Sequence, residues 1–286
     1  MNKYRKSQLN KVKFTVKETD LSFFVKGKKV VGTLSLPDSD TKAPVVLLIH
    51  GFTGNRHESV SKSAPKGKFA LLASKLSEVG IASLRIDMRG SGQSAGSLEN
   101  ITAFTELEDA IAACDYLKQC DHVDGKRISV LGLSFGGLVA TALCAKDSKI
   151  KSLVLWNPAV NMMEVMLTIA GIDPVMHACK DEHKIYEFDI WNAKRKLCGE
   201  FFTSLCRMSA HASIAKYKGP MLLQVGLNDH VVWPEPAQAE GIISCHEGEH
   251  ELQTVNAGHD FTNNGSDEPL LSVIEKTVSF LKVNAF

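Results

Sequence analysis

Apolar and polar residues alternate at the start of the chain and later give way to short, continuous apolar runs. The alternation covers residues 13–36 and predicts two or three antiparallel strands, followed by a turn at residues 37–40. Its apolar positions are Phe14, Val16, Leu21, Phe23, Val25, Val30, Leu34 and Leu36. From residue 45 onward, continuous apolar runs, typical of strands buried on both faces, alternate with stretches of helical spacing.

These runs set the expected order of elements. Strands are expected over residues 45–49, 82–86, 128–133, 150–156, 221–225 and 252–255, and helices over 69–79, 101–117, 136–145, 236–243 and 270–281. Strands that alternate with helices predict an α/β fold with a mostly parallel sheet and helices on both faces. Residues 157–217 interrupt the alternation without a clear buried strand, and we interpret them as a helical insertion within a single domain that covers residues 1–286.

Charge and cysteine usage narrow the possible partners and compartment. Lys and Arg total 33 against 32 Asp and Glu, a net charge of +1, which argues against a general nucleic-acid binder. No secretory signal is visible at the basic start of the chain, and the seven cysteines include no C-x-x-C pair, so we expect free thiols in the cytoplasm.

An uncharged run of 18 residues, 128–145, reaches the length at which a membrane span becomes a candidate. This run contains a motif that explains its composition differently. Gly132-Leu133-Ser134-Phe135-Gly136 is a G-x-S-x-G sequence between a predicted strand and a predicted helix, the context of a nucleophile elbow. Two flanking glycines allow a sharp turn that exposes the serine, so Ser134 is the candidate nucleophile and stable membrane insertion is not expected.

A serine nucleophile needs a base and an acid that orients it, and both have candidates downstream. Asp229 follows the strand predicted at 221–225, and His259 follows the strand predicted at 252–255. The order Ser, Asp, His is that of the nucleophile-elbow hydrolases, and all three residues fall at one edge of the sheet. Singly, each has an ordinary alternative: Asp229 as a turn or cap carboxylate and His259 as a solvated loop histidine.

Two backbone amides are candidates for an oxyanion hole. His50-Gly51-Phe52 follows the strand predicted at 45–49, and Gly51 would let the chain turn so that the Phe52 amide faces the reacting carbonyl. The Phe135 amide, next to the nucleophile, would be the second donor.

Together these residues resemble the α/β-hydrolase superfamily over nearly the whole chain. The segments HGFTGNRHE (50–58) and RIDMRGSGQSAGSLENITAFTELEDAIAACDYL (85–117) are similar to those of small bacterial cinnamoyl (feruloyl) esterases, and more loosely to the serine-aminopeptidase-like and monoglyceride-lipase-like branches. The resemblance implies an α/β-hydrolase fold in which residues 157–217 form a lid over the substrate. Leu133 and Phe135 stand where those esterases usually have His and Gln.

The sequence therefore predicts a serine esterase that acts on small to medium esters, possibly hydroxycinnamoyl esters, through an acyl-enzyme and without cofactor or metal. A peptidase, a thioesterase and a monoacylglycerol-lipase-like enzyme stay open, as does a non-catalytic binding protein on the same scaffold, and the oligomeric state is not predicted. Two further patterns are interpreted as structural: the zinc-like His246-Glu247-Gly248-Glu249-His250, which is expected to form a polar loop, and the dinucleotide-like 90–95, which continues as a loop instead of opening a helix.

Overall fold

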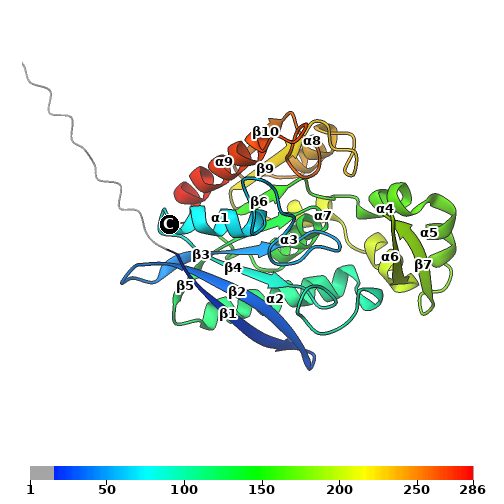
Figure 1. Cartoon of the computed structure of the whole chain (residues 1–286), viewed down its shortest axis with the longest axis horizontal. Coiled ribbons are helices and arrows are strands. Elements are labelled where there is room, and N and C mark those ends of the chain that lie inside the picture. The colour runs from blue at the N-terminus through cyan, green and yellow to red at the C-terminus, as the bar shows by residue number, and fades with distance from the viewer. Residues whose placement is uncertain (1–15, 286) are drawn as a thin grey trace, which may run out of the picture.

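A mostly parallel sheet of eight strands runs through the centre of the molecule (Figure 1). The computed structural model describes residues 16–285. The strands of this sheet are β1 (Val16–Val25), β2 (Lys28–Pro37), β3 (Ala43–Ile49), β4 (Ala82–Asp87), β5 (Val123–Leu133), β6 (Leu153–Trp156), β9 (Met221–Gly226) and β10 (His250–Val255). Their order is β1-β2-β4-β3-β5-β6-β9-β10. The pairs β1–β2 and β2–β4 are antiparallel and all others are parallel, as the sequence predicts.

The opening alternation corresponds to two strands, β1 and β2, joined by a tight turn at Lys26 and Gly27. Phe14, assigned to this pattern from the sequence, lies outside the described residues. The predicted strand at 150–156 is shorter than expected, because only Leu153–Trp156 pairs with its neighbours.

Helices cover both faces of the sheet, which explains the continuous apolar runs. In β3, Val45, Leu47 and Ile49 pack in one core cluster, whereas Val46 and Leu48 pack in the other. The first cluster contains apolar residues of α2 (Ala103–Gln119), α3 (Phe135–Lys146) and α8 (Ala237–Ser244), and the second contains those of α1 (Lys68–Ser77) and α9 (Glu268–Asn284). A strand between two helical layers has no solvent-facing side, so its pattern does not alternate.

The uncharged run 128–145 forms the end of β5, the turn at Ser134 and most of α3. Both elements are buried at the centre of the fold, which accounts for the lack of charge. None of the helices formed by residues 16–285 combines the length and apolarity needed to cross a bilayer.

Residues 157–217 lie between β6 and β9 and extend to one side of the sheet (Figure 1). The predicted helical insertion does contain helices, but the expectation that it has no strand was wrong. Besides α4 (Met162–Ala170), α5 (Ile172–Ala178), α6 (Gly199–Cys206) and α7 (Ala210–Ile214), it contains an antiparallel hairpin of β7 (Ile185–Ile190) and β8 (Ala193–Cys198). Trp191 and Asn192 form its two-residue turn with positive φ values of 52° and 58°, a geometry matched to the strand twist of hairpins. The strand β7 does alternate, but the consecutive basic residues 194–196 interrupt the pattern in β8, so the pair was not recognised as a hairpin.

Candidate active site

Ser134 lies at the junction of β5 and α3, in a conformation that non-glycine residues rarely adopt. Its φ of 54° and ψ of −121° turn the chain sharply at the first step of the helix. A Cβ atom at Gly132 would lie 2.3 Å from the carbonyl oxygen of Gly136, and one at Gly136 would lie 2.3 Å from that of Ile49. The two glycines of the motif are thus required by close backbone approach, as the elbow interpretation expects.

Asp229 and His259 form a hydrogen-bonded pair at the same end of the sheet. His259 Nδ1 lies 2.6 Å from Asp229 Oδ2, and the Asp229 side chain is fully buried. Asp229 Oδ1 accepts hydrogen bonds from the amides of Val231 (2.7 Å) and Val232 (3.0 Å), which fixes the carboxylate plane. This carboxylate accepts from Nδ1, so the histidine carries a proton there and leaves Nε2 as its acceptor.

Ser134 is 7% exposed, and within residues 16–285 its hydroxyl forms no hydrogen bond to His259. In enzymes without bound substrate such bonds are often long and tighten only in the complex. Ser134 is instead placed by its backbone: its amide donates to the Trp156 carbonyl (2.9 Å), and its own carbonyl accepts from the Ala159 amide (2.9 Å).

The loop after β3 passes directly beside the nucleophile. A Cβ atom at Gly51 would lie 3.3 Å from the Cβ of Ser134. Phe135 is the first residue of α3, where backbone amides have no partner inside the helix, so its amide can donate to a bound oxyanion. The Phe52 amide likewise donates to no other group among the described residues.

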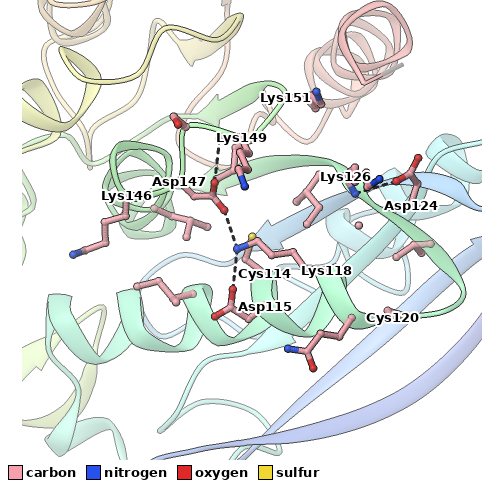
Figure 2. A pocket seen from close by; sticks show the side chains of 18 of the residues that line it. Cys114, Asp115, Lys118, Cys120, Asp124, Lys126, Lys146, Asp147, Lys149 and Lys151 are labelled. Atoms are coloured by element: carbon pink, nitrogen blue, oxygen red, sulfur yellow. Dashed lines mark hydrogen bonds and ion pairs between the residues drawn. The ribbon is translucent and has the colours of Figure 1, made fainter.

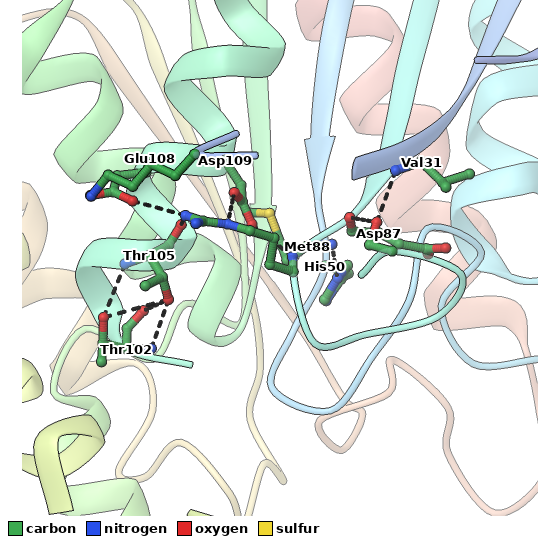
Figure 3. Close-up of polar contacts among 11 residues, drawn as sticks. Val31, His50, Asp87, Met88, Thr102, Thr105, Glu108 and Asp109 are labelled. Carbon is green, nitrogen blue, oxygen red and sulfur yellow. Dashed lines mark hydrogen bonds and ion pairs between the residues drawn. The ribbon is translucent and has the colours of Figure 1, made fainter. Parts of the chain in front are cut away.

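Two side chains brace this loop. His50 Nε2 accepts from the Met88 amide (3.1 Å), so its Nδ1 carries the proton and donates to the Gly51 carbonyl (2.8 Å); Figure 3 shows His50 beside Met88. Glu58 Oε1 accepts from the Gly51 amide (2.7 Å). His50 and Glu58 therefore hold the turn that presents the Phe52 amide.

The dinucleotide-like residues 90–95 form part of a loop between β4 and the short 3-10 helix η1 (Leu98–Asn100). Ser94 Oγ donates to the Asp87 carbonyl (2.6 Å) and accepts from the Val31 amide (2.8 Å), and Figure 3 shows Val31 close to Asp87. Asp87 also accepts from the amides of Arg56 (2.7 Å) and Gln93 (2.8 Å). These bonds tie the loop to the protein's own backbone.

The loop that carries His259 is anchored by a buried amine. Lys68, at the start of α1, is 2% exposed and its Nζ lies 2.5 Å from Asp260 Oδ1, which also accepts from Ser59 Oγ (3.0 Å). Burial alone would raise the pKa of Asp260, but the Lys68 charge and these hydrogen bonds outweigh it and lower the pKa. Nothing in the sequence pattern indicates a role for Lys68, because a lysine near the start of a predicted helix is an ordinary feature.

An aromatic cluster joins the candidate oxyanion residues to the insertion. Phe201 of α6 stacks on Phe52 (ring centroids 5.5 Å apart) and meets Phe135 edge to face (5.9 Å). Trp191, at the hairpin tip, lies 6.1 Å from Phe52 and is 48% exposed. The side chains beside the predicted oxyanion amides are therefore packed against residues 157–217, with one exposed indole at the edge of the cluster.

Glu235 is a second carboxyl in the segment that follows Asp229. Its Oε2 accepts from the Ala239 amide (3.2 Å), but Oε1 is buried without a hydrogen-bond partner. Burial raises the pKa of Glu235 to about 7, and the charge of Asp229 adds to the rise, against the lowering effect of the Ala239 hydrogen bond.

A cavity of about 1210 Å³ lies at the other end of the sheet, between the C-terminal ends of α2 and α3 (Figure 2). In the wall of this cavity, Lys118 Nζ forms ion pairs with Asp115 (2.8 Å) and Asp147 (2.9 Å). The cavity is therefore separate from the loops that carry Ser134, Asp229 and His259.

The zinc-like segment is a loop at residues 246–249 that leads into β10. The His246 ring stacks on Tyr217 (centroids 5.9 Å apart) and lies 5.8 Å from the ring of His250. Both histidines of a zinc motif of this kind must lie on one helix face, which this segment does not form. No group of three or more potential metal ligands gathers within residues 16–285.

Comparison with known proteins places these features in a family context. A family model described as alpha/beta hydrolase fold matches residues 44–176. Among solved structures, Est1E from Butyrivibrio proteoclasticus with bound ferulic acid is 28% identical with a TM-score of 0.77, and the match covers 92% of this chain and 98% of Est1E.

Curated sequence relatives match smaller parts of the chain than Est1E does. An uncharacterized 31.7 kDa protein of Escherichia coli is 28% identical over 43% of this chain and 40% of its own length. Acylamino-acid-releasing enzyme 2 from Oryza sativa subsp. japonica is 26% identical over 68% of this chain but 24% of its own length. The chain spans less than half of the length of the first curated relatives it matches.

Proposed function

Because the chain has the alpha/beta hydrolase fold, we propose that it is a serine carboxylic-ester hydrolase with Ser134 as nucleophile, His259 as general base and Asp229 as orienting acid. The observation that carries the proposal is the 2.6 Å hydrogen bond between His259 and a fully buried Asp229, at the sheet edge where Ser134 occupies a strained turn. An unrelated structural role would not need these three features at one edge.

The proposed mechanism follows from the hydrogen bonds. Asp229 keeps the proton of His259 on Nδ1, so Nε2 takes the proton of the Ser134 hydroxyl as that oxygen attacks the ester carbonyl. The imidazolium then gives its proton to the departing alcohol, which leaves an acyl group on Ser134. Water repeats the sequence in the second half-reaction and releases the acid.

The amides of Phe52 and Phe135 would hold the negative oxygen of each tetrahedral intermediate. The turn that presents the Phe52 amide is braced by His50 and Glu58 before substrate arrives, so little reorganisation is needed. The proposal requires neither metal nor cofactor, since both half-reactions use only protons and the acyl group.

For the substrate, we propose small to medium esters with an aryl-acyl group, hydroxycinnamoyl esters among them. Trp191 places an exposed indole against Phe52, beside the proposed oxyanion hole, with buried Phe201 packed on Phe52, and residues 157–217 would act as the lid that encloses this site. The likeness to Est1E, whose structure holds ferulic acid, supports this choice. The seven cysteines are free thiols, which supports a cytoplasmic enzyme.

A second candidate is an amide or thioester hydrolase on the same triad. The rice relative, an acylamino-acid-releasing enzyme, favours a peptidase, since the triad itself does not distinguish these bonds.

A substrate panel tests the choice: methyl ferulate, p-nitrophenyl acetate, an acyl-CoA and an aminoacyl anilide, each with wild type, Ser134→Ala and Ser129→Ala. Ser129 is a buried serine of β5 that hydrogen-bonds Ser152 (2.8 Å), so its variant controls for general damage. We expect the highest kcat/KM for methyl ferulate and loss of activity in Ser134→Ala alone. Preference for the anilide would support the peptidase, and equal activity of the two variants would refute the proposal.

A further inference from the structure

Asn157 lies between the elements that carry the three proposed catalytic residues. It directly follows β6, and β6 lies between β5, which leads to Ser134, and β9, which leads to Asp229. The residue is fully buried and has a φ of 38°, a region in which Asn is among the few tolerated side chains. A buried amide in such a conformation is held there by its partners.

The Asn157 side chain connects the end of β9 to the loop that carries His259. Its Oδ1 accepts from the Gly226 amide (2.8 Å) at the end of β9, and its Nδ2 donates to the carbonyl oxygen of His259 (2.8 Å). One partner can only donate and the other can only accept, so the orientation of the Asn157 amide is fixed. Its backbone amide also donates to the Gln224 carbonyl (2.9 Å).

The neighbours of Asn157 hold the nucleophile in turn. Trp156 accepts from the Ser134 amide and Ala159 donates to the Ser134 carbonyl, each at 2.9 Å. The segment 156–159 is therefore attached to Ser134 through its backbone and to His259 through the Asn157 side chain. One short segment therefore connects the backbone of the nucleophile to the backbone of the proposed base.

We propose that Asn157 is a positioning residue that sets the distance between His259 and Ser134. The inference rests on the proposed function, because it assigns a catalytic base to the residue that Asn157 holds. β10, which precedes His259, is an edge strand that pairs with β9 alone among the strands of residues 16–285, so the loop after it needs an anchor from the sheet centre. The Lys68–Asp260 pair anchors the other side of the loop.

The effect of losing this anchor follows from the geometry of proton transfer. A displacement of about 1 Å between reacting groups costs on the order of 100-fold in rate. Asn157→Gly keeps the positive φ without strain and deletes both side-chain hydrogen bonds. We expect its kcat to fall about 10- to 100-fold with KM nearly unchanged, since no substrate contact is removed.

Asn157→Asp provides a second variant that preserves side-chain shape and still accepts from the Gly226 amide. It loses the donor to His259 and places a carboxylate beside that loop, which favours the imidazolium. We expect a lower kcat and an acid limb of the kcat/KM profile displaced to higher pH by about one unit. The fall in kcat at nearly constant KM separates positioning from a structural role, because a merely structural loss lowers the melting temperature and leaves kcat unchanged.

Ser152→Ala is the matched control, because it removes one buried hydrogen bond (Ser152 Oγ to Ser129 Oγ, 2.8 Å) just before the opposite end of β6. Wild-type kcat in both Asn157 variants, with melting temperatures lowered as in Ser152→Ala, would overturn the inference. If wild type itself hydrolyses no ester of the panel and Ser134 is unreactive, the proposed function fails instead, so the two failures are distinguishable.

Discussion

Replacing Asp229 by Asn should abolish most activity without unfolding the protein, because it inverts the protonation of His259. Asp229 Oδ1 accepts from the amides of Val231 and Val232, and Oδ2 lies 2.6 Å from His259 Nδ1. The two buried amides require an acceptor, so the oxygen of the new amide takes the Oδ1 position and its NH₂ faces Nδ1. An NH₂ group only donates, which moves the histidine proton to Nε2, where the mechanism needs a lone pair.

The expected loss is about 10⁴-fold in kcat, or about 5 kcal/mol of transition-state stabilisation. Hydrolysis of p-nitrophenyl acetate measures it, with thermal unfolding as the test of folding. Asp267→Asn is the control, since Asp267 also accepts two hydrogen bonds from a neighbouring loop, from Ser61 Oγ (2.9 Å) and the Ser63 amide (2.5 Å). An Asp229→Asn enzyme within about tenfold of wild type would refute the reasoning.

Three further predictions concern stability and the aromatic cluster. Glu235 binds its proton more tightly in the folded protein than in the unfolded chain, so the free energy of unfolding falls as pH rises from 4.5 to about 7. Glu235→Gln should therefore stabilise the protein by at most about 3 kcal/mol at pH 8 and have no such effect at pH 4. Chemical denaturation at both pH values measures the difference. Trp191→Ala should raise KM for methyl ferulate about 2- to 10-fold and leave p-nitrophenyl acetate hydrolysis unchanged, since the indole lies 6.1 Å from Phe52; equal effects on both esters would count against an aryl site. Asp260→Ala should lower the free energy of unfolding by about 3 kcal/mol, because it leaves the buried Lys68 ammonium without its carboxylate; an unchanged denaturation midpoint would contradict this.

The sequence predicts the core of this fold well because burial on two faces leaves a plain signature. The runs at β3 and β5 are continuous since both faces of each strand are covered, and Ser134 is recognisable because the elbow demands glycine at two fixed positions. Asp229 and His259 were located by their place after strands, and the structure joins them by a hydrogen bond.

The residues that support the site were not predictable in the same way. Asn157 and Lys68 act through contacts with groups far along the chain: Asn157 reaches the His259 carbonyl 102 positions away and Lys68 reaches Asp260 192 positions away. Contacts between residues so far apart produce no periodic pattern or motif in the sequence, so they could not be predicted from it. The hairpin β7–β8 was missed for a different reason, since both strands are short and three consecutive basic residues, 194–196, break the alternation in β8.

The central claim is that Ser134 is the reactive nucleophile, and covalent labelling tests it most directly. Wild-type protein is treated with a fluorophosphonate probe and analysed by intact mass and peptide mapping, beside Ser134→Ala and Ser129→Ala. We expect one adduct per chain, located on Ser134, in wild type and Ser129→Ala, and none in Ser134→Ala. Labelling of another residue, or a folded wild type that takes up no probe, would contradict the account.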